Sequence, residues 1–187
     1  MDAGATILGS PDPEDYPLRD SGWGDGRQER SSLIYAEKAE NVMLRGRGAI
    51  DGQGQYWWRR MGWPDRLKIP RAQRTAAELA ELANGRPNLI KFVGCKLVTL
   101  EQLHLVNSPS WTVHPLFCEF VRVDGITIQN PVPSPNTGGI NPQSCRNVQI
   151  MNSRIDVGDD CVTLKSGITR PDGGWAGPTK TSPSPTA

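Results

Sequence analysis

The sequence CKLVTLEQLHLVN at residues 95–107 is followed by two related stretches, CEFVRVDGITIQN at 118–130 and CRNVQIMNSRIDV at 145–157. Each begins with cysteine and continues with short alternating runs of β-branched or apolar residues, and the first two end with asparagine. The three cysteines are 23 and 27 residues apart. A repeat of this length that contains several short strands predicts a solenoid, in which each repeat forms one coil and packs on the next.

Alternation within the repeats indicates which side chains face the interior. The second repeat would turn four side chains to one side: Val121, Val123, Ile126 and Ile128. Gly125 would let the chain turn between its two strands. A weaker repeat at residues 41–46 leads into GAIDGQGQYWW at 48–58, so the solenoid is expected to begin well before the first cysteine.

One helical insertion is expected between the early and the later repeats. In RAQRTAAELAELANG, at residues 71–85, Thr75 and Glu78 match the Thr-x-x-Glu pattern of a capping box, and Asn84-Gly85 provides a stop. The segment RPNLIKF at 86–92 then returns to strand character. We therefore expect a short helix beside the coils.

Composition limits the possible functions. At 187 residues, 36% of them hydrophobic, the chain is long enough for one domain with a sizeable core. Its 21 basic and 20 acidic side chains nearly cancel, which argues against nucleic acid or an anionic membrane as a partner. The sequence has no apolar run as long as a membrane span, and its start has no secretory-signal pattern. The four cysteines include no Cys-x-x-Cys pair, so no metal site is predicted.

The stretch NTGGINPQSCRNVQIMNSRIDVGDDCVTLKSG at residues 136–167 bears most directly on function. Together with the string at 48–58 and SPSWTVHP at 108–115, it is similar to family 28 of the glycoside hydrolases, the polygalacturonases and related pectinases. The resemblance implies an all-β fold, a partial single-stranded right-handed parallel β-helix over residues 1–165. It also implies inverting hydrolysis of α-1,4-galacturonosyl bonds in pectin by a secreted or periplasmic monomer that needs no cofactor.

The same resemblance gives roles to the paired aspartates. Hydrolysis of a glycosidic bond needs carboxyl groups on both sides of the bond, and inverting enzymes hold them about 6.5–9.5 Å apart. By resemblance, Asp159 is the general acid and Asp160 activates the water. Gly138, 21 residues before Asp159, occupies the position of the family's first aspartate, and Asn141 that of a second acidic residue. One catalytic carboxylate is therefore missing, and Asp160 would activate the water alone. On its own, a Gly-Asp-Asp string is also typical of a turn or a calcium loop.

Three further residues are predicted to bind the substrate, namely Lys165, Asn136 and His114. Lys165 follows the aspartates on an expected strand and would meet a galacturonate carboxylate, with a solvated strand lysine as the alternative. His114 either lines the cleft or makes structural hydrogen bonds.

Tryptophans and cysteines have both packing and functional interpretations. Trp111, Trp57 and Trp58 are expected to pack in the core, with stacking on sugar as the alternative, and we place Trp57-Trp58 on a strand. The cysteines that open the repeats are expected to stack as small apolar residues, with disulfides between adjacent coils as the alternative. By resemblance to fungal members, Cys161 would pair with a cysteine further along.

Two other functions remain open. One is a non-catalytic carbohydrate-binding or decayed β-helix fragment, which the missing carboxylate favours. The other is a polysaccharide lyase on a similar fold, which would need calcium and a strong base.

Residues 166–187 are expected to form an irregular tail, because this segment has four prolines and no strand pattern. Loss of one nucleotide after the codons for Thr179-Lys180 would produce the Thr-Ser-Pro-Ser-Pro ending from a strand-like continuation. A frameshift is therefore one hypothesis for this segment, and a disordered Pro/Ser tail is the other.

Overall fold

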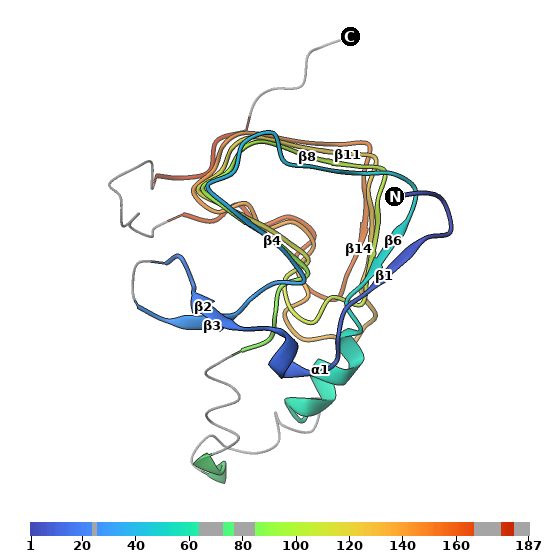
Figure 1. The fold of residues 1–187 in the computed structure, drawn as a ribbon, viewed down its shortest axis with the longest axis vertical. Helices are drawn as coiled ribbons and strands as arrows, with labels where there is room; N and C mark the ends of the chain where they lie inside the picture. Colours follow the sequence, from blue (N-terminus) through green and yellow to red (C-terminus); the bar gives the residue numbers. More distant parts are fainter. Residues whose placement is uncertain (24–25, 64–72, 77–84, 167–176, 182–187) are drawn as a thin grey trace.

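The structure is a computed structural model that describes residues 1–23, 26–63, 73–76, 85–166 and 177–181. Viewed along its axis, the chain winds through coils that overlie one another (Figure 1). Adjacent coils pair through parallel strands, so the predicted all-β parallel β-helix is confirmed.

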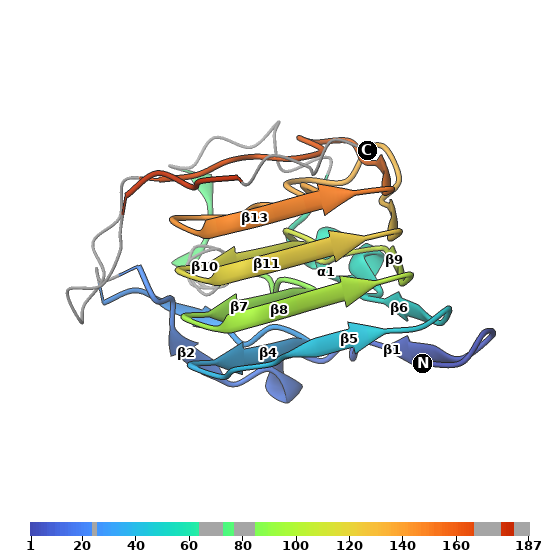
Figure 2. The same cartoon turned by 90° about the horizontal axis from the view of Figure 1, so that it is seen from above.

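Three parallel sheets form the walls of the β-helix within the described residues. The first has the order β1-β6-β9-β12-β14, with strands at Thr6–Leu8, Ala49–Asp51, His104–Val106, Thr127–Gln129 and Arg154–Asp156. The second has the order β10-β7-β4, with strands at Val113–Leu116, Ile90–Val93 and Ile34–Glu37. The third, whose strands run side by side in Figure 2, has the order β13-β11-β8-β5, at Arg146–Met151, Glu119–Asp124, Lys96–Glu101 and Met43–Arg45.

Two smaller elements precede or flank these walls. An antiparallel pair is formed by β2 (Leu18–Asp20) and β3 (Gln28–Arg30), and a short 3₁₀ helix covers Pro13–Asp15. The first described coil therefore has a hairpin beside it, which contributes to the site below.

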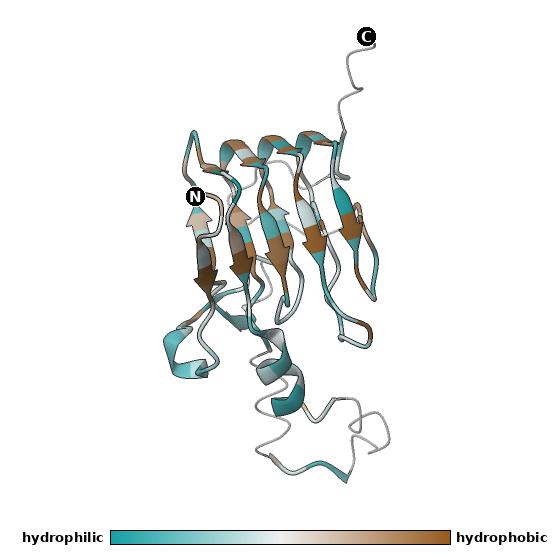
Figure 3. Ribbon diagram, turned by 90° about the vertical axis from the view of Figure 1, so that its right-hand side faces the viewer, coloured by the Kyte–Doolittle hydropathy of each residue, from teal (hydrophilic) through white to brown (hydrophobic). Residues whose placement is uncertain are grey.

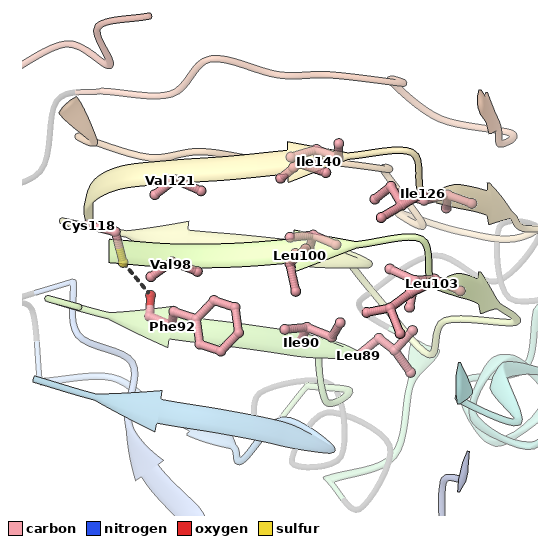
Figure 4. Close-up of a cluster of buried hydrophobic side chains, with 14 of the residues drawn as sticks. Leu89, Ile90, Phe92, Val98, Leu100, Leu103, Cys118, Val121, Ile126 and Ile140 are labelled. Carbon is pink, nitrogen blue, oxygen red and sulfur yellow. Dashed lines mark hydrogen bonds between the residues drawn. The ribbon is translucent and has the colours of Figure 1, made fainter. Parts of the chain in front are cut away.

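The core runs through the middle of the coils because alternate strand residues point inward. Equivalent positions of successive coils lie in register, as in the row Ile50, Leu105, Ile128 and Ile155 of the first sheet. The apolar segments of these strands line up in Figure 3, and Figure 4 shows the packed interior. The four side chains predicted to face inward from the second repeat are all buried.

The cysteines that open the repeats lie in this interior. Cys95, Cys118 and Cys145 are buried and free, as the stacking interpretation predicts, and Cys161 is free and exposed. The Cys118 thiol donates to the carbonyl of Phe92 in the preceding coil, at 3.4 Å (Figure 4). Each buried thiol therefore has a backbone partner within the stack.

Each coil turns at corners where one residue adopts a left-handed backbone conformation. One such corner recurs in four coils, and its occupants in chain order are Gly46, Gln102, Gly125 and Asn152. A side chain with a Cβ is strained in this conformation, whereas glycine is not and asparagine tolerates it. Gln102, at φ 56°, is the long side chain in this row, and it is exposed.

Gln102→Gly is therefore expected to raise the free energy of unfolding by about 1 kcal/mol, since it removes left-handed strain and loses no buried contact. The reverse change, Gly125→Ala, should lower it by a similar amount. The nearest atom to a Cβ at Gly125 would be Gln102 Cγ at 3.7 Å, an ordinary contact. The loss of stability in Gly125→Ala would therefore come from backbone strain and not from a steric clash. Urea unfolding of both variants measures the effect, and a less stable Gln102→Gly protein would contradict it.

The placement of Trp57 and Trp58 on a strand is wrong. They lie in helix α1 (Gly54–Arg60), and both are buried, as the packing interpretation predicts. The chain leaves the sheet here because Gly52 and Gly54 allow it to approach the next coil closely. A Cβ at Gly54 would lie 2.6 Å from the carbonyl oxygen of Ser108. Any larger residue would force the two segments apart.

Other predictions concern segments that the structure describes only in part. The helix expected from Thr75 onward falls mainly on residues 77–84, outside the described residues. No helix among the described residues is long and apolar enough to cross a membrane. Within the segment predicted as an irregular tail, Lys180 N–H donates to the carbonyl of Cys145 and Thr181 forms a parallel bridge with Val148. The domain boundary at residue 165 stays a prediction.

Candidate active site

Backbone pairing between two adjacent coils brings Gly138 next to the aspartate pair. Gly139 N–H donates to the carbonyl of Asp160 at 2.9 Å, and Ile140 N–H donates to that of Cys161 at 3.0 Å. A Cβ built on Gly138 would lie 3.4 Å from the Asp160 carbonyl oxygen. The coil spacing of a parallel β-helix therefore places the two parts of the sequence motif side by side, although 21 residues separate Gly138 from Asp159.

The two aspartate side chains are exposed and differ in their partners. Asp159 Oδ1 accepts a hydrogen bond from Asp160 N–H at 2.8 Å, which ties the Asp159 side chain to the backbone of the pair. Asp160 Oδ2 accepts from the Thr163 hydroxyl at 3.1 Å. Asp159 lines a cavity of about 420 Å³ together with Met61, Trp63, Asn136, Gly158 and residues 132–135. A carboxylate at the wall of an open cavity can reach a bound polysaccharide.

Asn141 lies beside Gly138, the position of the missing carboxylate. Its side-chain oxygen and nitrogen are each 3.2 Å from the Cβ position of Gly138. The side chain is buried, and its Nδ2 has no hydrogen-bond partner among the described residues. Gly138 does not have a left-handed backbone conformation, so a side chain is conformationally allowed there. A side chain at 138 would therefore need a small shift of Asn141, and it would have the Asn141 amide as a donor beside it.

A second cavity, of about 340 Å³, adjoins the first. It is lined by Ser21, Trp23, Arg27, Gln28, Glu29, Met61, Gly85, Arg86, Asn88, Ser110, Trp111, His114 and Asn136. Met61 and Asn136 line both cavities, so the two form one groove. Asn136 sits at the junction, where its Oδ1 accepts from Arg86 Nη2 at 2.9 Å.

Lys165 is beside the second cavity. Its Nζ lies 4.7 Å from the ring centroid of Trp111, and its backbone pairs with the preceding coil through Lys165 N–H and the carbonyl of Pro142. The lysine thus contacts a groove residue and is not a fully solvated strand residue. The sugar-stacking alternative for Trp111 gains support, because this half-buried ring lines the groove.

His114, on β10, is buried in the wall of the same cavity. Its Nδ1 lies 3.4 Å from Asn88 Nδ2 and its Nε2 lies 3.1 Å from Gln143 Oε1. Burial lowers the pKa of His114 well below its usual value, and the nearby Lys91 charge lowers it further. A neutral ring with both nitrogens engaged supports the structural hydrogen-bonding alternative.

Protonation of His114 is expected to make stability depend on pH. Below about pH 6.5 the unfolded chain takes up a proton on this residue and the folded chain does not, so the free energy of unfolding falls as the pH is lowered. The slope is at most about 1.4 kcal/mol per pH unit. Urea unfolding between pH 7 and pH 5 should show a smaller fall for His114→Gln than for the unchanged protein. His104→Gln is the matched control, and equal pH dependence in all three proteins would contradict the expectation.

Some residues that shape the site were not singled out from the sequence. Buried Asn130 accepts from Ser108 N–H at 2.8 Å and donates to the Thr137 carbonyl at 2.9 Å, so it joins the SPSW segment to the segment that carries Gly138. The only sequence signal for this role was that Asn130 ends the second repeat, as Asn107 ends the first. Trp23 and Arg27 had no repeat or motif to mark them.

A buried lysine also pairs with a glutamate in the wall of the groove. The Lys91 ammonium is buried and donates to Glu29 and to the carbonyl of Ser21. Burial raises the pKa of Glu29 and lowers that of Lys91, and each partner's charge opposes the shift in the other. No cluster of three or more His, Cys, Asp or Glu side chains that could hold a metal ion occurs in the described part of the chain.

Comparison with known proteins gives a consistent family. Residues 24–170 match the model of glycosyl hydrolases family 28. The chain is 38% identical over 170 residues to a "Probable polygalacturonase" from Vitis vinifera, a match that covers 87% of this chain and 31% of the relative.

Solved structures agree with this match. The chain superposes with a TM-score of 0.70 and 32% identity on an exopolygalacturonase from Thermotoga maritima, covering 87% of this chain and 41% of that one. It superposes with a TM-score of 0.68 and 28% identity on a polygalacturonase from Erwinia carotovora ssp. carotovora, covering 90% and 45%. This chain thus spans about a third of its curated relative and less than half of either solved structure. The matched motif, the fold and the relatives together show that the chain belongs to glycosyl hydrolases family 28.

Proposed function

We propose that the groove binds pectin and hydrolyses α-1,4-galacturonosyl bonds with inversion, as a monomer acting outside the cytoplasm where pectin occurs. The observation that carries the proposal is the position of the Asp159-Asp160 pair. In a chain that belongs to family 28, Asp159 lines the groove and the backbone of Asp160 lies beside the neighbouring coil's Gly138. Relatives named polygalacturonases support the same substrate class.

In this mechanism Asp159 protonates the glycosidic oxygen as the bond to the anomeric carbon breaks. Asp160 accepts a proton from the water whose oxygen attacks that carbon from the opposite face. Asn141 Nδ2 is buried and has no partner among the described residues, so it can donate to a group at position 138 but does not contact the substrate directly. The proton lost by Asp159 and the proton gained by Asp160 balance, and solvent restores both groups.

Substrate binding in this proposal uses Asn136 and Lys165. Asn136 lies at the junction of the two cavities and can bond to sugar hydroxyl groups, while Lys165 attracts a galacturonate carboxylate. His114 supports the wall from behind through its contacts with Asn88 and Gln143.

A second candidate function is binding of carbohydrate without cleavage. The observation that favours it is the absence of carboxylates at Gly138 and Asn141, since an aspartate at 138 would share water activation with Asp160. The groove itself would serve either function.

Incubation of the chain with polygalacturonate distinguishes the candidates. Hydrolysis yields new reducing ends without an unsaturated product, whereas a lyase yields both reducing ends and the ultraviolet absorbance of a 4,5-unsaturated uronate. We expect the first result. Absence of new reducing ends, with polygalacturonate still bound, would establish the binding function in its place.

A further inference from the structure

We propose that the cavity lined by Trp23, Trp111 and Arg27 is a subsite for a galacturonosyl unit that is not the one being cleaved. This inference rests on the proposed substrate, and it adds Trp23 and Arg27 as residues that select a charged sugar. These two residues come from the loop between β2 and β3, far in sequence from the aspartate pair.

The aromatic part of the subsite is a continuous wall. The rings of Trp23 and Trp111 are stacked, with centroids 6.4 Å apart and an angle of 25° between their planes. His114 fixes the Trp111 ring from one side by an edge contact at 4.8 Å. At 6.4 Å no sugar ring can enter between the two indoles, so a sugar would lie against the exposed part of the wall. Sugars use their apolar C–H faces in such contacts, and aromatic rings supply the matching surface.

The charges around the wall favour an anionic sugar. Arg27 Cζ lies 4.9 Å from the ring centroid of Trp23, and Lys165 Nζ lies 4.7 Å from that of Trp111, so a cation accompanies each indole. Glu29 is the acidic residue in the lining, and Lys91 pairs with it. Among the described lining residues, basic side chains therefore outnumber acidic ones, although the net charge of the chain is only +1. A guanidinium that lies over an aromatic ring can donate two hydrogen bonds to one carboxylate.

The position of the cavity identifies which sugar it would hold. Asn136 and Met61 line it on one side and line the Asp159 cavity on the other. Arg86 holds this junction by donating to the carbonyls of Pro109 and Pro135 and to the Asn136 side chain. A polysaccharide with one bond at Asp159 would thus continue past Asn136 onto the aromatic wall, and its next galacturonosyl carboxylate would meet Arg27.

Binding of trigalacturonate tests this subsite without relying on hydrolysis. Calorimetry on the chain carrying Asp159→Asn measures the dissociation constant, and adding Arg27→Gln should raise it at least about tenfold, since a charge-assisted hydrogen bond is lost. Arg122→Gln is the matched control. Arg122 is an exposed arginine on β11, paired with Asp124 and outside the groove, and its loss should change the constant less than about twofold. The neutral galactose trimer with the same linkage should bind much more weakly than trigalacturonate.

A second measurement does not depend on any substitution. The indole N–H signals of Trp23 and Trp111 should shift in NMR spectra when trigalacturonate is added, while those of Trp57 and Trp58, buried in α1, should not. Equal affinity of the Arg27→Gln protein, equal binding of the neutral trimer, or no binding by the chain would each overturn the inference. A chain that binds through Arg27 but releases no reducing ends would keep the subsite and disprove only the hydrolase proposal.

Discussion

Gly138→Asp is expected to raise the rate of polygalacturonate hydrolysis by about 10²–10⁴-fold, the range credited to a positioned general base. The new carboxylate would arise beside the Asp160 segment, where it could share activation of the water. The backbone at 138 is not left-handed, so a side chain is allowed there, and Asn141, 3.2 Å from the new Cβ, must shift by a few tenths of an ångström to make room for it. The Asn141 amide, which has no partner among the described residues, would donate to the carboxylate. Initial rates of reducing-end release measure the gain.

Gly138→Asn is the control that separates chemistry from packing. It fills the same space with a side chain of the same shape that cannot act as a base. The Asp variant should be much faster than the Asn variant, and the pH dependence of its rate should move upward because neighbouring carboxylates raise one another's pKa. Equal rates for two folded variants would show that position 138 does not take part in catalysis.

Asp159→Asn is expected to lower the rate of polygalacturonate hydrolysis by about 10²–10⁴-fold, because an amide cannot protonate the leaving oxygen. Its oxygen can still accept the hydrogen bond from Asp160 N–H, so the loop geometry should persist. The loss should be much smaller with an aryl galacturonide, whose leaving group needs little protonation. This difference between substrates identifies an acid and not merely a binding residue.

The matched control is Asp156→Asn, on the same coil and at the end of β14. Asp156 is exposed and does not line either cavity, so this variant should keep the unchanged rate on both substrates. If Asp159→Asn lowered both rates equally, the role of Asp159 as the general acid would have to be abandoned.

The repeats allowed the fold to be predicted because a solenoid repeats a local pattern. The inward positions of the second repeat, the turn at Gly125 and the proximity of Gly138 to Asp160 all follow from the spacing of successive coils. The repeat length in the sequence sets that spacing, so the sequence of the repeats was sufficient to predict these features.

Features that depend on contacts outside the repeat were missed. Trp57 and Trp58 were predicted to lie on a strand because the preceding sequence has no helix-capping residue. The helix forms where Gly52 and Gly54 bring the chain against the next coil. The stacking of Trp23 on Trp111 joins a hairpin loop to a distant coil, and no periodicity links the two. The roles of Asp159, Asp160, Asn136 and Lys165 stay predictions until activity and binding are measured.

The buried polar contacts also bear on folding accuracy. Rows such as Ile50, Leu105 and Ile128 would pack almost equally well if a coil docked one repeat out of place, so apolar contacts alone distinguish poorly between the correct and the slipped arrangement. Asn130 has partners in two particular segments, through Ser108 and Thr137, and a slipped coil would leave it unsatisfied. Each buried polar group left unpaired costs about 1–3 kcal/mol, so the hydrogen bonds of Asn130 favour the correct arrangement of the coils over the slipped one.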